Sequence, residues 1–165
     1  MMTNKNLIYI AGPTGVGKTE LSIAVAKKLN TEIISCDSRQ FFKELKIGTS
    51  PPSKKQLKEV NHHFIHNKSI HDVYNVGLYE KEATKVLTEL FHKKDNIILV
   101  GGSGLYADSI IYGIDEIPKI PNEIRDNLNN NFEINGIKYL QSILSIKDPE
   151  SVSYTHLTLP TTVSV

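Results

Sequence analysis

The chain has 165 residues, of which 39% are apolar, so it is long enough to build a soluble globular domain with a hydrophobic core. Its formal charge of +1 does not indicate a nucleic-acid-binding surface along the whole chain. Its apolar runs are too short to cross a bilayer and its single cysteine cannot form an internal disulfide, so we expect a cytoplasmic protein without membrane attachment.

A phosphate-binding loop is predicted near the N-terminus. An apolar run over residues 7–11 predicts a strand, and residues 18–29 carry apolar side chains at helical spacing. Between them the sequence matches G-x-x-x-x-G-K-[ST] completely, and a strand–loop–helix setting is the context in which this pattern indicates a P-loop. We therefore predict that eight residues bind a diphosphate or a nucleotide: Gly12, Pro13, Thr14, Gly15, Val16, Gly17, Lys18 and Thr19.

The chemistry of such a loop assigns roles to two side chains. Glycines let successive backbone N–H groups point at the phosphates, and the N-terminus of the following helix adds its positive dipole end. Lys18 supplies a mobile positive charge, and the Thr19 hydroxyl is a suitable ligand for Mg²⁺, which is the cofactor we expect. The loop alone does not determine which phosphate compound it binds.

An acid follows the second predicted strand, residues 32–35, at Asp37. Because carboxyl ends of parallel strands meet at one edge of a sheet, we expect Asp37 beside the P-loop, where a carboxylate can accept a proton from an attacking nucleophile. Ordinary turn capping by Asp37 is the alternative that the pattern leaves open. The strand over 97–100 ends in Gly101 rather than in the magnesium-binding acid of many P-loop hydrolases, which disfavours hydrolysis.

Alternating strands and helices determine the predicted fold class. With a further helix over residues 79–93, the pattern predicts an α/β fold: a P-loop NTPase-like parallel sheet flanked by helices. After Gly113 the residue pattern changes. Two prolines, Pro118 and Pro121, precede a predicted helix from Asn122, and a second helix is predicted over residues 135–144. We expect residues 1–115 to form the N-terminal part of a P-loop catalytic core and residues 116–151 to begin a helical insertion domain.

The last segment, residues 152–165, contains no Asp, Glu, Lys or Arg and no helical period. Its string VSYTHLTLPT resembles the out-of-frame translation of a transposon-end sequencing adapter, so we expect this segment not to be native. A genuine hydrophobic strand is the alternative. On the first interpretation the natural protein continues past about residue 150.

Four segments together resemble one enzyme family. GPTGVGKT, EIISCDSRQFFKELKIGTSPP, HHFI and GGSGLYADSIIYGI occur in the order and at about the spacings of tRNA dimethylallyltransferases, over residues 7 to about 126. The resemblance implies transfer of a dimethylallyl group from dimethylallyl diphosphate to N6 of the adenosine adjacent to the anticodon in tRNA. Its implied partners are the tRNA anticodon loop and dimethylallyl diphosphate, with residues 116–151 in the tRNA-binding insertion, and we expect a monomer.

The resemblance also implies residue roles. Asp37 corresponds to the general base, Lys18 stabilises the leaving diphosphate, and Ser103 stands where the family usually has Thr, near the transferred group. The implied tRNA contacts are Asp37, Ser38, Arg39, Gln40 and Ser103. Ser103 as a helix N-cap remains an alternative.

Other features depart from the family or leave its assignment open. Cys36 stands where the family has Ala, and the family's later Gln- and Arg-rich segment is absent, so we expect this chain to be inactive alone. Because the histidines lack an acidic partner in the sequence and the family has a His-His pair here, we expect structural or substrate-side roles rather than metal binding for His62, His63, His66 and His71. The alternative function is that of an ATP-dependent small-molecule kinase with an acid at the acceptor.

Overall fold

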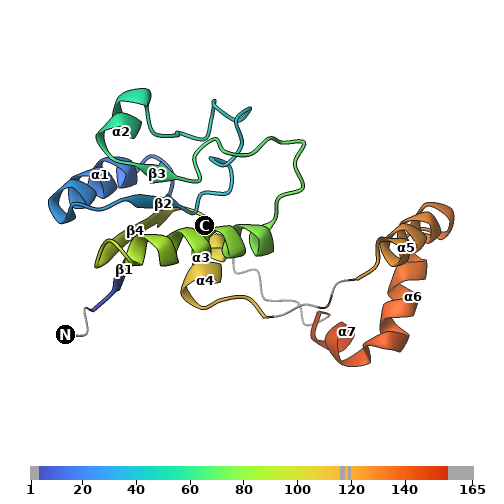
Figure 1. Ribbon diagram of the computed structural model, residues 1–165. Coiled ribbons are helices and arrows are strands. Elements are labelled where there is room, and N and C mark those ends of the chain that lie inside the picture. The colour runs from blue at the N-terminus through green and yellow to red at the C-terminus, as the bar shows by residue number, and fades with distance from the viewer. Residues whose placement is uncertain (1–3, 116–117, 119, 156–165) are drawn as a thin grey trace, which may run out of the picture. The chain divides into compact units, whose positions relative to one another are not determined.

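The computed structural model describes residues 4–115, 118 and 120–155. The chain divides into two compact units, Met1–Asp115 and Glu116–Val165, and each is considered by itself. The first unit contains a four-stranded parallel sheet with the order β1-β4-β2-β3 (Figure 1). Its strands are β1 (Asn6–Ala11), β2 (Ile33–Ser35), β3 (His62–His63) and β4 (Asn96–Gly101).

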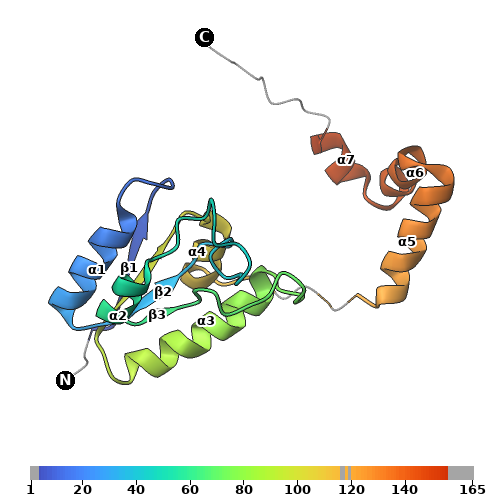
Figure 2. The ribbon, with the colours of Figure 1, turned by 90° about the horizontal axis from the view of Figure 1, so that it is seen from above.

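Helices cover both faces of this sheet, which confirms the predicted α/β class. They are α1 (Lys18–Leu29), α2 (Lys54–Glu59), α3 (Val76–Phe91) and α4 (Gly104–Ile111). Figure 2 shows α1 and α3 on opposite sides of the strands. The sequence patterns missed α2 and β3, because a six-residue helix and a two-residue strand are too short to display a hydrophobic period, whereas α4 begins where Ser103 was an alternative helix N-cap.

The central strand β4 explains how the two helical layers form one core. Alternate residues of a strand point to opposite faces. Ile97 and Leu99 pack with the layer of α3 and α4, whereas Ile98 packs with α1. All three side chains are fully buried. A strand covered on both faces needs apolar residues at every position, which is why this strand reads as an uninterrupted apolar run.

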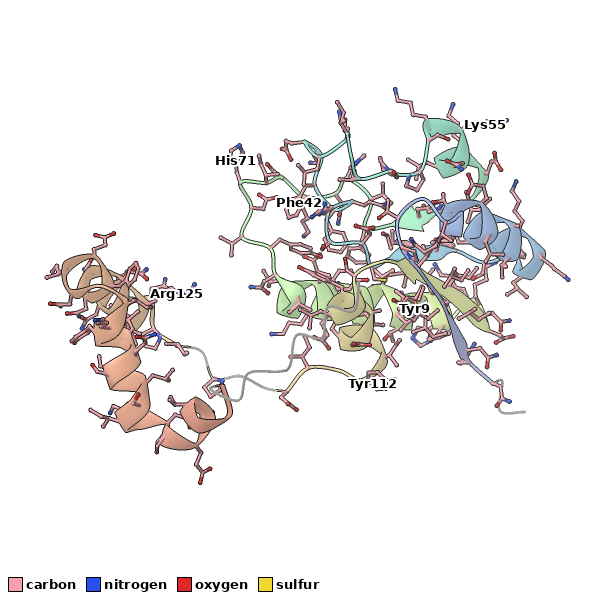
Figure 3. The ribbon with its side chains drawn as sticks, turned by 180° about the vertical axis from the view of Figure 1, so that it is seen from behind. Tyr9, Phe42, Lys55, His71, Tyr112 and Arg125 are labelled. Carbon is pink, nitrogen blue, oxygen red and sulfur yellow. The ribbon has the colours of Figure 1, made fainter. Side chains whose placement is uncertain are left out.

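An aromatic cluster anchors the long connection between β2 and α3. Figure 3 labels two residues of this connection, Phe42 and His71. Phe41 stacks on Tyr79 of α3 with ring centroids 5.0 Å apart, and Tyr106 of α4 meets Tyr79 edge-on at 5.2 Å. The Tyr79 hydroxyl donates a buried hydrogen bond of 2.9 Å to the Ser35 carbonyl. Burial raises the pKa of Tyr79, so its phenol stays protonated and holds the end of β2.

The second unit contains α5 (Asn122–Asn135), α6 (Ile137–Lys147) and α7 (Pro149–Thr155), so helices occur where the sequence predicted them after Asn122. Helix α7 includes residues 152–155, although the sequence of this segment shows no helical period. The reason is local: Asp148 Oδ1 accepts a hydrogen bond of 3.0 Å from the Ser151 N–H and so starts the helix. The expectation that the segment 152–165 is not native stays a prediction, and its residues 156–165 lie outside the described residues. Among those described, no helix is both long and apolar enough to span a membrane.

Candidate active site

The P-loop adopts a backbone that only glycine accepts without strain. Gly12, Gly15 and Gly17 have φ values of 152°, 85° and 92°, and Gly17 is the N-cap of α1. These left-handed conformations turn the chain from the end of β1 into the helix within a few residues. The predicted loop is therefore formed at the carboxyl end of β1, with the N-terminus of α1 facing its cleft.

Lys18 folds back over this loop. Its Nζ atom donates a hydrogen bond of 2.6 Å to the carbonyl of Pro13. A Cβ on Gly12 would lie 3.7 Å from Cδ of Lys18 and 3.2 Å from Cγ1 of Val16, so the glycine leaves room for both side chains. The ammonium is thus held at the loop, where phosphate oxygens can replace the carbonyl as its partner.

Gly101 at the end of β4 lets the segment that carries Asp37 approach closely. Asp37 does not follow the strand next to β1, because β4 lies between β1 and β2. A Cβ on Gly101 would lie 2.8 Å from the carbonyl carbon of Cys36 and 2.9 Å from the amide nitrogen of Asp37, and one on Gly102 would lie 3.4 Å from the Gly12 carbonyl oxygen. Glycine at 101 therefore lets the end of β2 approach β4 this closely, and an acid there would not fit, whereas a Cβ on Gly102 would make only an ordinary contact.

Asp37 caps a turn and also borders the cleft, so the turn-capping alternative is confirmed while its role as a proton acceptor stays a prediction. Its Oδ1 atom accepts a hydrogen bond of 3.2 Å from the Arg39 N–H, which caps the turn after β2. Asp37 also lines two adjacent cavities. Burial, and to a smaller extent the charge of Asp37, raise the pKa of the neighbouring Cys36 thiol to about 12. That thiol therefore stays neutral in the core.

Ser103 lies at the N-cap position of α4, but its side chain makes no cap hydrogen bond. Instead its Oγ atom accepts a hydrogen bond of 3.1 Å from the Ser38 N–H and lies 3.1 Å from Ser38 Oγ. This pair joins the segment after β2 to the segment after β4. The structure thus brings together Ser38 and Ser103, which are 65 positions apart in the chain.

Arg39 and Gln40 differ in exposure and in their partners. Arg39 is exposed and lines the cavity beside Ser103. Gln40 uses its amide within the chain, where Nε2 donates to the carbonyls of Thr49 (3.0 Å) and Ser50 (3.2 Å). A tRNA contact of Gln40 stays a prediction, whereas its role in holding the cleft wall is visible in the structure.

Two cavities meet at Asp37. The first, of about 310 Å³, lies over the P-loop and is lined by loop residues including Lys18 and Thr19. Its apolar lining comes from Pro51, Pro52, Ile65 and Val100. The second, of about 200 Å³, is lined by Ser38, Arg39 and Ser103 together with short loop segments. Besides Asp37, Thr14 borders both cavities. The Asp37 side chain therefore borders two neighbouring cavities.

The first cavity contains oxygen ligands that suit Mg²⁺. Thr19 and the carboxylates of Glu20 and Asp37 line it. Hydroxyl and carboxylate oxygens are the ligands that this hard cation prefers. The Thr19 hydroxyl has no hydrogen bond to any part of the chain that the structure describes, so it is available to a phosphate-bound cation.

The four histidines do not form one cluster. His63 Nε2 lies 2.8 Å from Oε2 of Glu32, which directly precedes β2, so an acidic partner does exist, contrary to the sequence interpretation. Burial would raise the pKa of Glu32, but hydrogen bonds from His63 and Asn61 hold it below its ordinary value. Nowhere in residues 4–115, 118 and 120–155 do three His, Cys, Asp or Glu side chains gather as a metal site.

His62 is a cleft residue that the sequence did not assign to the site. It lines the first cavity, its Nδ1 lies 2.9 Å from the Val60 carbonyl, and burial lowers its pKa. The imidazole is therefore held neutral, with Nδ1 as the donor. Pro51, Pro52 and Ile65 were missed as well, because nothing in an apolar residue's local pattern tells whether it lines a cavity or fills a core.

The comparisons with known proteins identify the family. A sequence model described as IPP transferase matches residues 40–161, which is more than half of the chain. The chain belongs to the IPP transferase family. This match includes ten residues of the segment 152–165 and begins at Gln40, after the P-loop and Asp37.

The curated proteins that are similar to this chain are named as tRNA dimethylallyltransferases. The chain is 56% identical to the tRNA dimethylallyltransferase of Flavobacterium johnsoniae over 88% of its own length and 47% of that protein's. It is 46% identical to tRNA dimethylallyltransferase 1 of Bacteroides fragilis, covering 90% of the chain and 50% of the relative. The chain therefore spans about half the length of the relatives it matches.

Two solved structures are similar. The full-length tRNA isopentenylpyrophosphate transferase of Bacillus halodurans gives a TM-score of 0.66 at 32% identity, over 93% of this chain and 51% of that one. A eukaryotic dimethylallyltransferase acting on tRNA gives a TM-score of 0.75 at 25% identity, over 93% and 38% of the two chains. These likenesses confirm the fold assigned to this IPP transferase family member.

Proposed function

We propose that the protein transfers a dimethylallyl group from dimethylallyl diphosphate to N6 of the adenosine adjacent to the anticodon in tRNA. The observation that carries this proposal is the pair of cavities that share Asp37. One combines the phosphate-binding loop with the apolar side chains of Pro51, Pro52, Ile65 and Val100, which suit the two parts of a short prenyl diphosphate. The other has hydroxyls and an arginine, which suit a base and its phosphates.

The donor cavity stabilises the departing diphosphate. As the C–O bond at the allyl carbon breaks, the bonding electrons leave with the diphosphate and negative charge grows on its bridging oxygen. Lys18 and the loop N–H groups are positioned at the carboxyl end of β1 to meet that charge. Mg²⁺, held by Thr19 and the phosphate oxygens, would supply further charge neutralisation there.

The acceptor cavity presents the adenine. The N6 amine of adenine attacks the allyl carbon, a new N–C bond forms, and the amine proton becomes acidic as its nitrogen gains positive charge. Asp37 accepts that proton. Its turn-capping bond from Arg39 leaves the second carboxylate oxygen without a hydrogen bond from the described residues, so that oxygen is free to do so. To reach the cavity, the adenosine must leave the stack of its loop.

Replacement of Asp37 by Asn tests this assignment, in the protein at the full length of its relatives. The amide keeps the shape and the capping oxygen but removes the base. We expect dimethylallyl diphosphate still to bind while labelled prenyl transfer to unmodified tRNA falls by about two to four orders of magnitude. Lys28→Ala, a change at an exposed position near the end of α1, provides the comparison for general damage to the fold.

Two outcomes would contradict the proposal. Full transfer activity in Asp37→Asn would remove Asp37 as the base. Transfer of a γ-phosphate from ATP to a small hydroxylated acceptor, without labelling of tRNA, would indicate the kinase alternative instead.

A further inference from the structure

The apolar wall of the donor cavity contains one side chain whose position is enforced by its neighbours. Four apolar residues line this cavity: Pro51, Pro52, Ile65 and Val100. Ile65 has the largest side chain of the four. It belongs to the segment that leaves β3, and it lines the cavity over the P-loop but not the one around Ser103.

The backbone on both sides of Ile65 is unusual. Phe64 has φ of 64° and His66 has φ of 49°, although neither is glycine. A bulky residue rarely adopts this left-handed conformation. Residues held in such conformations cluster at ligand sites, where the surrounding structure over-determines them. Two of them flanking one cavity residue therefore indicate that the position of Ile65 matters to a ligand.

Specific contacts hold these two residues. The Phe64 ring is buried, with its centroid 5.2 Å from that of Tyr79 and 6.4 Å from that of Phe41. The His66 N–H donates a hydrogen bond of 2.8 Å to the Gln40 carbonyl. Because both neighbours are held in this way, the backbone at Ile65 cannot move away from the cavity without breaking these contacts.

We propose that Ile65 limits the length of the prenyl chain, so that a five-carbon donor is accepted and a ten-carbon donor is not. This inference rests on the proposed function. With the diphosphate on the P-loop and the allyl carbon directed toward Asp37, the remaining carbons share the cavity with Ile65. The cavity's volume of about 310 Å³ is at the small end of the usual range for ligand pockets. A second five-carbon unit needs space that the Ile65 side chain occupies.

The test compares donors of two lengths. In the protein at the full length of its relatives, Ile65→Ala and Ile65→Val are assayed with unmodified tRNA and either dimethylallyl diphosphate or geranyl diphosphate. The readout is the ratio of kcat/KM for the ten-carbon donor to that for the five-carbon donor. We expect this ratio to rise at least about tenfold in Ile65→Ala and by less in Ile65→Val, since single apolar groups discriminate by this order.

Ile70→Ala is the matched control. Ile70 follows on the same connection, is half exposed and lines neither cavity, so its variant should keep the wild-type ratio. An unchanged ratio in Ile65→Ala would overturn the proposal. If Ile65→Ala does not fold, an unchanged ratio in Ile65→Val would overturn the proposal instead. Failure of the wild-type protein to use either donor is a different result, and it would contradict the proposed function itself.

Discussion

Substitution of Gly101 by alanine tests the convergence of strand ends that builds the site. A Cβ at this position would lie 2.5 Å from Cys36 Sγ, 2.8 Å from the Cys36 carbonyl carbon and 2.9 Å from the Asp37 amide nitrogen. Two of these three atoms belong to the backbone of the neighbouring strand's end. The methyl group therefore fits only if the segment carrying Asp37 moves away from β4.

The expected cost follows from these contacts. Overpacking a tight core costs about 1–3 kcal/mol, and we expect the upper end of that range because the obstructing backbone is itself held by neighbours. One of those restraints is the hydrogen bond of 2.8 Å from the Cys36 N–H to the Val100 carbonyl. Adding Cys36→Ala to the same chain removes the Sγ contact but leaves both backbone contacts, so it should restore only part of the lost stability.

Gly104→Ala is the control for the loss of a glycine. Gly104 begins α4, and a Cβ there would meet no atom within 4 Å. Alanine in a helix is more stable than glycine by about 0.5–1 kcal/mol, so this variant should unfold at a slightly higher denaturant concentration than the wild type.

Urea unfolding followed by circular dichroism measures all four proteins. With a slope of about 1–3 kcal/mol per molar urea, a loss of about 3 kcal/mol lowers the midpoint by about 1–3 M. A midpoint for Gly101→Ala equal to that of the wild type would refute the close approach of β4 to Asp37. Complete rescue by Cys36→Ala would show that the side chain alone, and not the backbone, sets the limit.

Two further predictions concern the donor cavity. Lys18→Ala removes a charge from the diphosphate's partners, so in the protein at the full length of its relatives turnover should fall by about two to three orders of magnitude. Lys28→Ala, at the far end of α1, should be neutral, and equal turnover in both variants at saturating donor would reject the assignment. His62 has a pKa below 6.5 in the folded chain, so the unfolded chain binds a proton first as the pH falls, and stability decreases below about pH 6.5 by at most about 1.4 kcal/mol per pH unit. Urea midpoints measured at about pH 7.5 and about pH 5.5 should differ less in His62→Asn than in the wild type, and an equal difference would show that His62 is not the group responsible.

The sequence alone determined the elements whose signal is local. The P-loop pattern needs only its own glycines, Lys18 and Thr19, and α1 begins and ends where its apolar spacing predicts. The strand over 97–100 was recognisable because burial on both faces demands consecutive apolar residues. Asp37 was found by the same logic, as an acid after a buried strand.

Only the tertiary structure decided how these parts combine. It placed β4 between β1 and β2, showed why Gly101 must lack a side chain, and paired Ser38 with Ser103. It also placed Ile65 in the donor cavity. These relations join residues that are distant in the chain, and each depends on which backbone lies beside which. A strand's own sequence specifies that it will be buried, but its neighbours in the sheet follow from the packing of the whole unit.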